Sequence, residues 1–245
     1  VPEIFMYSSN IGTAKMAFAA GGAEALQSFF QKLGFFAAPS LEIVEVAKPQ
    51  TPRRWADVTT ATTSFGHGFA ITPIQFVEAV GGLIGDGSMA PTTLLRRDPE
   101  QAIARKKLVS AATADELRFL MWLTVAQGTG TRAKLDSYAL GGKTGTAEKP
   151  ARGGYRHDAV LASFVGAFPI QAPRYVVLVM LDEPQGDAST HGYRYGGWTS
   201  APVVARIIDR IGPLLGVPPT PKTVNEKMEE RLVAGGYELQ SQQHE

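Results

Sequence analysis

The chain has 245 residues, of which 44% are hydrophobic, so it can bury a sizeable core as one domain or most of one. A formal charge of +1, with no basic cluster longer than Arg105–Lys107, argues against nucleic-acid binding. The lack of cysteine excludes disulfides and thiolate metal sites, and no apolar stretch reaches the roughly 18 residues that a membrane span needs.

Helical patterns dominate the first third of the chain. Asn10 is a candidate N-cap for a helix that the Gly21–Gly22 pair interrupts. Apolar residues spaced i, i+3, i+4 and i+7 then predict a core-packing helix that ends at Gly34: Leu26, Phe29, Phe30 and Leu33. Glu42–Val46 alternates like a short strand, and the Thr-rich stretch Thr59–Thr63 is predicted to belong to a long extended surface segment.

Two capping boxes mark the next helices. Thr72–Gln75 places Thr at the N-cap, Pro in the first turn and Gln at the third position, which predicts a helix to about Ile84. Thr113–Glu116 has the same spacing and precedes a strongly apolar helix that ends near Gly128.

The second half changes to strands. There are three β-like segments, Gly142–Glu148, Val160–Phe168 and Tyr175–Leu181, and the last two are joined by a short link, which favours antiparallel neighbours. A helix from Ser200 would cover one face of that sheet. The order of helices, strands and a covering helix predicts an α+β fold with an antiparallel sheet flanked by helices.

The chain end has a different composition. Residues 217–245 combine three prolines with a polar, Glu-rich stretch, and we expect a Pro-rich linker and a mobile, partly helical polar tail there. The globular part is therefore predicted to span residues 1–216.

Two short motifs carry the chemistry. Serine enzymes that act on D-alanyl peptides and β-lactams bring Ser-x-x-Lys, Ser-x-Asn and Lys-Thr-Gly together around one pocket. Ser8 and Asn10 supply the second motif, and Lys143–Gly145 supplies the third. No serine has a lysine three residues later. Because the chain begins at Val1, we expect a fragment cut downstream of its nucleophile, which predicts that this chain alone is inactive.

A strand that carries Lys-Thr-Gly can hold an extended peptide at its edge, and Gly145 would leave room for that approach. Thr144 and Thr146 alternate along the strand, so both hydroxyls can bind a terminal carboxylate beside the charge of Lys143. The Thr146 N–H would complete an oxyanion hole with the N–H of the nucleophile.

Ser8 and Asn10 have the residue types for the remaining steps. Ser8 would relay a proton to the leaving amine, held by Lys143, and Asn10 would orient the substrate amide. Either motif alone is weak evidence. Both together in this order favour the acyl-transfer interpretation over helix caps and an ordinary strand threonine.

At these residues the chain resembles the class B penicillin-binding proteins, most closely the cell-division branch of peptidoglycan D,D-transpeptidases. The resemblance runs from Pro2 to Gly216 and includes four segments in family order: SSNIGTAKMA, TTSFGHGFAITPIQ, GGKTGTAEK and WTSAPVV. It departs from the family in lacking Ser-x-x-Lys, in His67 and in Trp198.

The resemblance implies a transpeptidase fold like that of penicillin-binding proteins and serine β-lactamases, incomplete on its N-terminal side. It implies a full-length protein anchored upstream of this chain, with its catalytic domain at the periplasmic face of the inner membrane. Implied ligands are the D-Ala-D-Ala end of stem peptides and β-lactams, implied partners are division and glycosyltransferase proteins, and no cofactor is implied.

Other pocket residues remain open at this point. His67, in Phe65–Phe69, fits a packing turn as well as a pocket wall, because its two flanking glycines permit tight turning in both cases. Tyr193 belongs to a Gly-rich aromatic segment that fits a lip over the acyl group or a surface loop. His157, His191 and His244 have no partner at ligand spacing, so no metal site is predicted.

Two alternatives to the transpeptidase are kept. One is a D,D-carboxypeptidase or serine β-lactamase, in which water takes the acyl group. The other is a non-catalytic pseudo-transpeptidase that binds cell-wall peptides or division proteins as a scaffold. An intact Ser-x-x-Lys encoded upstream of Val1 would remove the scaffold alternative.

Overall fold

The computed structural model describes all residues except 99, 101, 152–153 and 237–245. It divides into two compact units, Val1–Leu117 and Arg118–Glu245, with the boundary inside helix α6 (Ala111–Gln127). The domain boundary expected at residue 216 stays a prediction. No helix within the described part of the chain is both long and apolar enough to cross a membrane.

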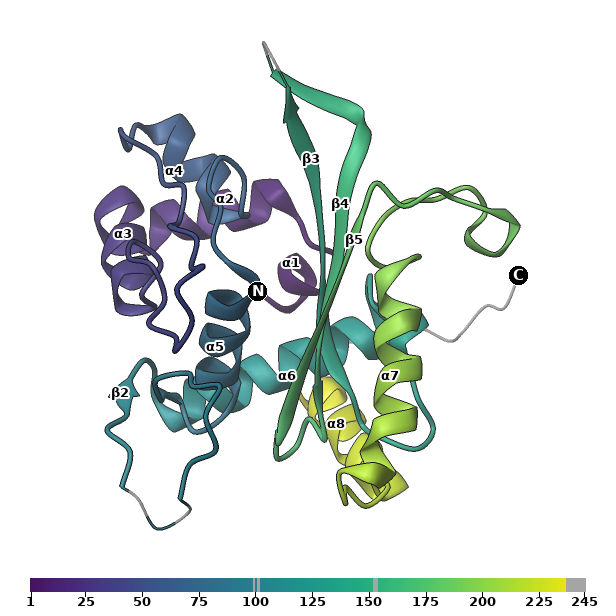
Figure 1. Cartoon of the computed structure of the whole chain (residues 1–245). Helices are drawn as coiled ribbons and strands as arrows, with labels where there is room; N and C mark the ends of the chain where they lie inside the picture. Colours follow the sequence, from purple (N-terminus) through teal and green to yellow (C-terminus); the bar gives the residue numbers. More distant parts are fainter. Residues whose placement is uncertain (99, 101, 152–153, 237–245) are drawn as a thin grey trace. The chain divides into compact units, whose positions relative to one another are not determined.

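Unit 1 is mainly helical (Figure 1). Its elements are α1 (Pro2–Met6), α2 (Asn10–Ala19), α3 (Gly22–Lys32), α4 (Asp57–Ser64), α5 (Pro73–Ile84) and the short antiparallel strands β1 (Ser88–Met89) and β2 (Lys106–Lys107). Leu33, Ala79 and Leu108 are buried together in its core, with Phe29 and Phe30 packed against them. The predicted core face of α3 is therefore confirmed.

The capping box of α5 is also confirmed. The Thr72 hydroxyl accepts a hydrogen bond from the Gln75 amide at 3.3 Å. The side-chain amide nitrogen of the buried Gln75 donates to the carbonyl oxygens of Gly34 (3.0 Å) and Ala37 (2.8 Å). One side chain thus closes the helix start and fixes the chain that follows α3.

Two predicted helix caps are wrong by a few residues. Ser9, not Asn10, is the N-cap of α2, because its hydroxyl accepts from the Gly12 amide at 3.1 Å. Helix α6 begins before Thr113, whose amide donates to the Ser110 hydroxyl at 3.0 Å. In both places a serine upstream of the predicted residue satisfies the free N–H groups of the first turn.

Two predicted extended segments are also wrong. Residues 42–46 form no strand; the Glu42 carboxylate instead accepts hydrogen bonds from Thr93 and, at 2.9 Å, from the Leu94 amide. Thr59–Thr63 lies inside helix α4. Threonine hydroxyls there donate to carbonyl oxygens one turn earlier, as Thr60 does to Ala56 at 3.1 Å. The side-chain to backbone hydrogen bonds that make threonine common in loops are therefore formed within the helix.

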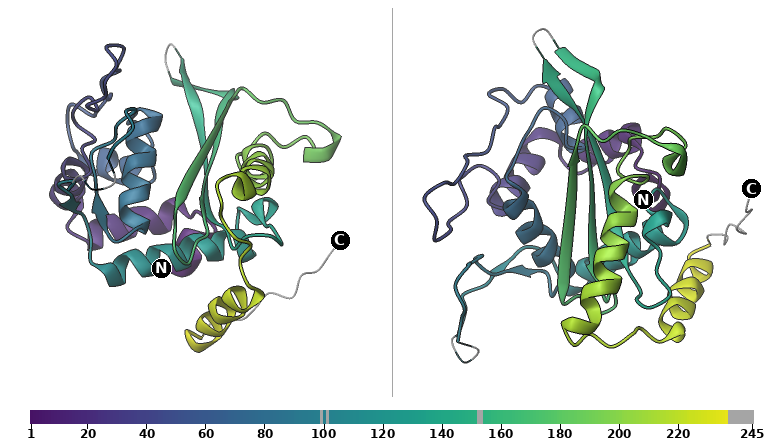
Figure 2. Two further views of the ribbon diagram at one scale, coloured as in Figure 1. Left: turned by 60° about the horizontal axis from the view of Figure 1, so that its bottom comes forward. Right: turned by 45° about the vertical axis from the view of Figure 1, so that its right-hand side comes forward.

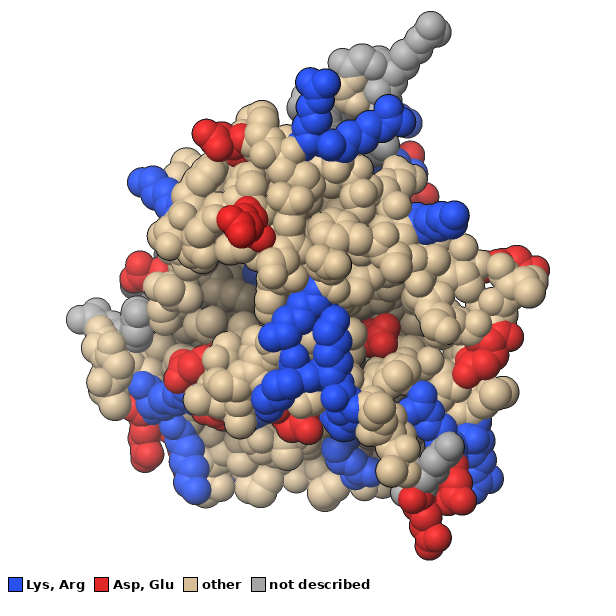
Figure 3. Space-filling model, turned by 90° about the vertical axis from the view of Figure 1, so that its left-hand side faces the viewer, with Lys and Arg blue, Asp and Glu red and all other residues tan. Residues whose placement is uncertain are grey.

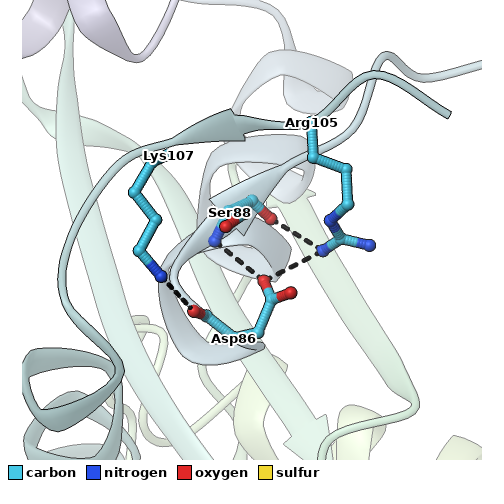
Figure 4. Close-up of polar contacts among 4 residues, drawn as sticks. All are labelled: Asp86, Ser88, Arg105 and Lys107. Carbon is cyan, nitrogen blue, oxygen red and sulfur yellow. Dashed lines mark hydrogen bonds and ion pairs between the residues drawn. The ribbon is translucent and has the colours of Figure 1, made fainter.

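A small polar network holds the β1–β2 hairpin (Figure 4). The Asp86 carboxylate accepts from the Ser88 amide at 2.9 Å and from Arg105 at 3.0 Å, and Lys107 donates to the Asp86 carbonyl at 2.9 Å. Desolvation alone would raise the pKa of Asp86, but the Ser88 amide and the Arg105 guanidinium hold it below its usual value. Lys and Arg side chains gather near the middle of the face that Figure 3 shows, on the side where β2 lies in Figure 1.

Unit 2 is built on a sheet of order β3–β4–β5. Its elements are β3 (Gly141–Ala151), β4 (Gly154–Phe168), β5 (Tyr175–Asp182), the short 3-10 helices η1 (Thr131–Ala133) and η2 (Ala188–Thr190), α7 (Ser200–Leu214) and α8 (Lys222–Ala234). Both pairings are antiparallel, and α7 packs on β4 and β5 (Figure 2). Phe164, Phe168, Val204 and Ile208 are fully buried between them. The predicted α+β fold is confirmed.

The segment predicted as a mobile tail contains a packed helix. In α8, Leu232 is 1% exposed, Asn225 accepts a hydrogen bond from the Trp122 indole at 3.0 Å, and Arg231 lies 4.5 Å from the centre of the Phe119 ring. The mobile description is therefore wrong for α8, and the last predicted tail residues, 237–245, lie outside the described residues.

Candidate active site

The Lys-Thr-Gly motif lies in β3, an edge strand whose pairing among the described residues is with β4. The Lys143 ammonium donates to the Thr144 carbonyl at 3.2 Å and to its hydroxyl at 3.4 Å. The Thr144 hydroxyl in turn lies 2.9 Å from the hydroxyl of Thr129, which follows α6. An ammonium and two hydroxyls thus converge at the start of the motif, a set of donors suited to an anion.

Burial changes the acid–base behaviour of this lysine. Desolvation lowers the pKa of Lys143 from 10.5 to about 8. The side chain is therefore mostly charged at neutral pH, yet it exchanges its proton far more readily than an exposed lysine does. A cation with a pKa near the working pH can bind a carboxylate and also support proton transfer.

Gly145 and Gly196 both pack against Ser163 too closely to carry a side chain. A Cβ on Gly145 would lie 2.5 Å from the Ser163 hydroxyl oxygen of the paired strand, and that hydroxyl donates to the Gly145 carbonyl at 3.3 Å. A Cβ on Gly196 would collide with the Ser163 carbonyl oxygen. The Gly196 amide donates to the Thr146 hydroxyl at 3.2 Å. The space that was predicted to be left for a ligand at Gly145 is, on the Cβ side, occupied by Ser163.

The loop between β5 and α7 carries an exposed aromatic cluster. The Tyr193 ring, 47% exposed, lies 5.0 Å from the Trp198 ring and 6.1 Å from the Tyr195 ring. Next to Trp198 in sequence, a Cβ on Gly197 would lie 3.4 Å from the Thr144 methyl carbon. The aromatic cluster is thus tied to β3 through its own backbone, as a wall of the site requires.

In unit 1, Ser8 lies in the turn between α1 and α2, and Asn10 is the first residue of α2. Ser8 has φ 56°, a left-handed conformation that costs a non-glycine residue roughly 1–2 kcal/mol. The Ser9 amide donates to the Ile4 carbonyl at 2.9 Å, and Ser9 caps α2 with its hydroxyl. Because Ser9 does the capping, the Asn10 side chain at the exposed start of the helix is not needed for it.

His67 lies in the turn after α4, also in unit 1. Its amide donates to the Thr62 carbonyl at 3.0 Å, and its half-buried ring lies 6.4 Å from the Phe65 ring. Gly66 and Gly68 on either side have φ of 88° and 75°, values that favour glycine. The two glycines therefore set a tight turn that fixes the position of the histidine backbone.

Lys143, Thr144 and Thr146 lie on β3 in unit 2, and Tyr193 lies in the loop that follows β5 of the same unit, while Ser8, Asn10 and His67 belong to unit 1. Sequence reasoning missed Thr129 and Ser163. Neither belongs to a recognisable motif, and each becomes visible only through the pairing partner that the fold gives it.

A family model of the penicillin-binding protein transpeptidase domain matches residues 1–209. The chain is 40% identical over 224 residues to a probable peptidoglycan D,D-transpeptidase, FtsI, of Caulobacter vibrioides, which covers 88% of this chain and 38% of that protein. It is 27% identical over 228 residues to the peptidoglycan D,D-transpeptidase FtsI of Escherichia coli, covering 92% of this chain and 38% of that protein.

Solved structures give the same result. The transpeptidase domain of penicillin-binding protein 3 from Burkholderia pseudomallei superposes with a TM-score of 0.79 at 33% identity, over 87% of this chain and 64% of that one. Penicillin-binding protein 3 of Mycobacterium tuberculosis in complex with aztreonam gives 0.77 at 26% identity, over 90% of this chain and 52% of that one. The chain spans less than two thirds of the length of these relatives. It belongs to the family of penicillin-binding protein transpeptidase domains.

Proposed function

We propose that this chain is part of a peptidoglycan D,D-transpeptidase of the cell-division type, which cross-links stem peptides through an acyl-serine intermediate. The observation that carries the proposal is the convergence at β3 of the Lys143 ammonium with the hydroxyls of Thr129 and Thr144, two residues before Thr146. The names of the relatives, peptidoglycan D,D-transpeptidases, support the same reaction.

The terminal D-alanine of a donor peptide is the ligand proposed for this part of β3. Its carboxylate would accept from the Thr144 and Thr146 hydroxyls, with the Lys143 ammonium as the nearby cation. A hydrogen bond to a charged group contributes about 1.5–3 kcal/mol, enough to select a free carboxylate over an internal peptide bond. The peptide backbone would run along the edge of β3 as an added strand.

Acyl transfer also needs proton relay, amide orientation and charge stabilisation. On the basis of residue type and order, we propose that Ser8, supported by Lys143, relays a proton to the leaving amine. Asn10 is proposed to orient the substrate amide. The Thr146 N–H is proposed as one oxyanion donor. His67 and Tyr193 are proposed as walls for the donor side chain.

The proposed nucleophile is a Ser-x-x-Lys serine outside these 245 residues, since none of their serines has a lysine three residues later. β-Lactams are proposed as acylating ligands, in line with the relative solved with aztreonam. Division and glycosyltransferase proteins are the proposed partners, and the periplasmic face of the inner membrane is the proposed location.

The test is the intact mass of the full-length protein after incubation with benzylpenicillin, followed by peptide mapping of the adduct. We expect one stable adduct on a Ser-x-x-Lys serine. The Thr146→Val variant should be acylated about tenfold more slowly, because it loses the charge-assisted hydrogen bond to the penicillin carboxylate. A folded protein that forms no adduct at high penicillin concentration would leave only the scaffold alternative.

A further inference from the structure

Arg132, in η1, has a role that the residues above do not cover. Its guanidinium carbon lies 3.6 Å from the centre of the Trp198 ring. At that distance the guanidinium must lie flat on the indole, because an N–H group pointing at the ring would push the carbon farther away. A flat stack leaves the N–H edge of the arginine free in the plane, the geometry that binds a carboxylate in bidentate fashion.

The remaining contacts of Trp198 hold this stack in place. The His191 ring meets the indole edge-on at 5.3 Å, and the Tyr193 ring lies at 5.0 Å. The indole is therefore contacted by three groups, and the arginine that rests on it has lost much of its side-chain freedom. An arginine that is ordered before a ligand arrives binds an anion at a lower entropic cost.

No acidic group among the described residues pairs with the exposed Arg132. Arg174, which lies 5.6 Å from the Tyr175 ring centre, differs from Arg132 because it donates a hydrogen bond to the Gly216 carbonyl at 3.4 Å. Arg132 thus combines an ordered guanidinium with an open N–H edge, and this combination points to an anionic ligand rather than to a fold contact.

Two independent connections place Arg132 on the Thr144 side of the site. Thr129, three residues earlier in the chain, shares a hydrogen bond of 2.9 Å with Thr144. A Cβ on Gly197, next to the Trp198 under the arginine, would lie 3.4 Å from the Thr144 methyl carbon. Arg132 therefore neighbours the position proposed for the carboxylate of the leaving D-alanine.

In acyl transfer the acceptor amine attacks where the leaving amine departs. The ester C–O bond to the serine breaks, a C–N bond forms, and one amine proton returns to the serine oxygen. We propose that Arg132 binds a second carboxylate on the acceptor, in addition to the one at Thr144 and Thr146, and so selects dicarboxylate acceptor amines. This inference rests on the proposed transpeptidase function and deepens it.

The test uses the full-length protein with an N-acyl-D-alanyl thioester as donor and two acceptors of the same size, D-glutamate and D-glutamine. They differ only in the second carboxylate. We expect the ratio of transfer to D-glutamate over D-glutamine to be about three- to tenfold in the wild type and to fall to about one in Arg132→Gln. Arg132→Lys should retain part of the preference, and Arg174→Gln should leave the ratio unchanged.

A second readout does not depend on transfer. In protein labelled with 5-fluorotryptophan, the Trp198 resonance is assigned by its loss in Trp198→Phe. D-glutamate should shift this resonance at concentrations where D-glutamine does not, and the shift should vanish in Arg132→Gln. If the shift is seen but no amine is ever acylated, the transpeptidase proposal fails and the anion site stands. Equal D-glutamate preference in the wild type and Arg132→Gln, with transfer intact, overturns the role of Arg132.

Discussion

Replacing Lys143 with methionine should make the protein more stable while removing its function. The lysine pKa is lowered from 10.5 to about 8 by burial. At about 1.4 kcal/mol for a change of one in pKa, keeping the ammonium charged at pH 7 costs the folded state about 3 kcal/mol. Methionine has a similar length and no charge. It loses the long hydrogen bonds to Thr144, of 3.2 and 3.4 Å, together worth about 1 kcal/mol.

The net expectation is a gain of about 2 kcal/mol in the free energy of unfolding at pH 7. The sign of the pH dependence follows from the lowered pKa. Between pH 8 and 10.5 the unfolded wild type binds more protons at this lysine than the folded wild type does. Wild-type stability attributable to Lys143 therefore rises with pH across that window, and the advantage of Lys143→Met should shrink there.

Urea unfolding followed by tryptophan fluorescence at pH 7 and pH 10 measures both effects. Only the difference between wild type and variant is used, because every other titratable group is common to both proteins. Lys106→Met, at an exposed position in β2, is the matched control and should change stability by less than about 0.5 kcal/mol at either pH. A Lys143→Met variant that is less stable at pH 7, or a difference that does not vary with pH, would refute the burial argument.

Further predictions concern packing, loop position and the hairpin. Leu232→Ala should lower the free energy of unfolding of unit 2 by about 2–4 kcal/mol, because Leu232 is 1% exposed, whereas the neighbouring Val233→Ala, at 56% exposure, should have little effect in the same denaturation experiment. Gly196→Ala should slow acylation by benzylpenicillin at least about tenfold with an unchanged far-ultraviolet circular dichroism spectrum, since the new methyl group collides with a β4 carbonyl and displaces the aromatic loop. Asp86→Ala should cost about 0.5–1.5 kcal/mol at pH 7. Because the pKa of Asp86 is lowered, that difference should fade as the pH drops below 4, and a constant difference down to pH 2 would contradict the assignment.

The predicted elements that were confirmed share a clear periodic or capping signal. The α5 box at Thr72–Gln75, the core face of α3 and the three strands of unit 2 are specified by local pattern, and tertiary packing agrees with it. The capping box predicted at Thr113–Glu116 is wrong although its pattern is clear, because the upstream Ser110 accepts the Thr113 N–H instead.

The misses come from contacts that no local pattern contains. Glu42 is held out of a strand by groups about fifty residues away, at Thr93 and Leu94. Helix α8 has a polar sequence, and its position depends on Trp122, more than one hundred residues earlier. Within the site, Lys143, Thr144 and Thr146 could be found from the motif. Thr129 acquires a role only through its hydrogen bond to Thr144, and Arg132 only through its stack on Trp198.

The most direct measurement is product analysis of the full-length protein incubated with a D-Ala-D-Ala-ended donor peptide and an amine acceptor, by mass spectrometry. The proposed function predicts release of D-alanine together with a new amide-linked product, and a loss of both in Thr144→Val,Thr146→Val protein. Release of D-alanine with only the hydrolysed donor would make the enzyme a D,D-carboxypeptidase. No release of D-alanine by folded, peptide-binding protein would contradict catalysis and leave a scaffold.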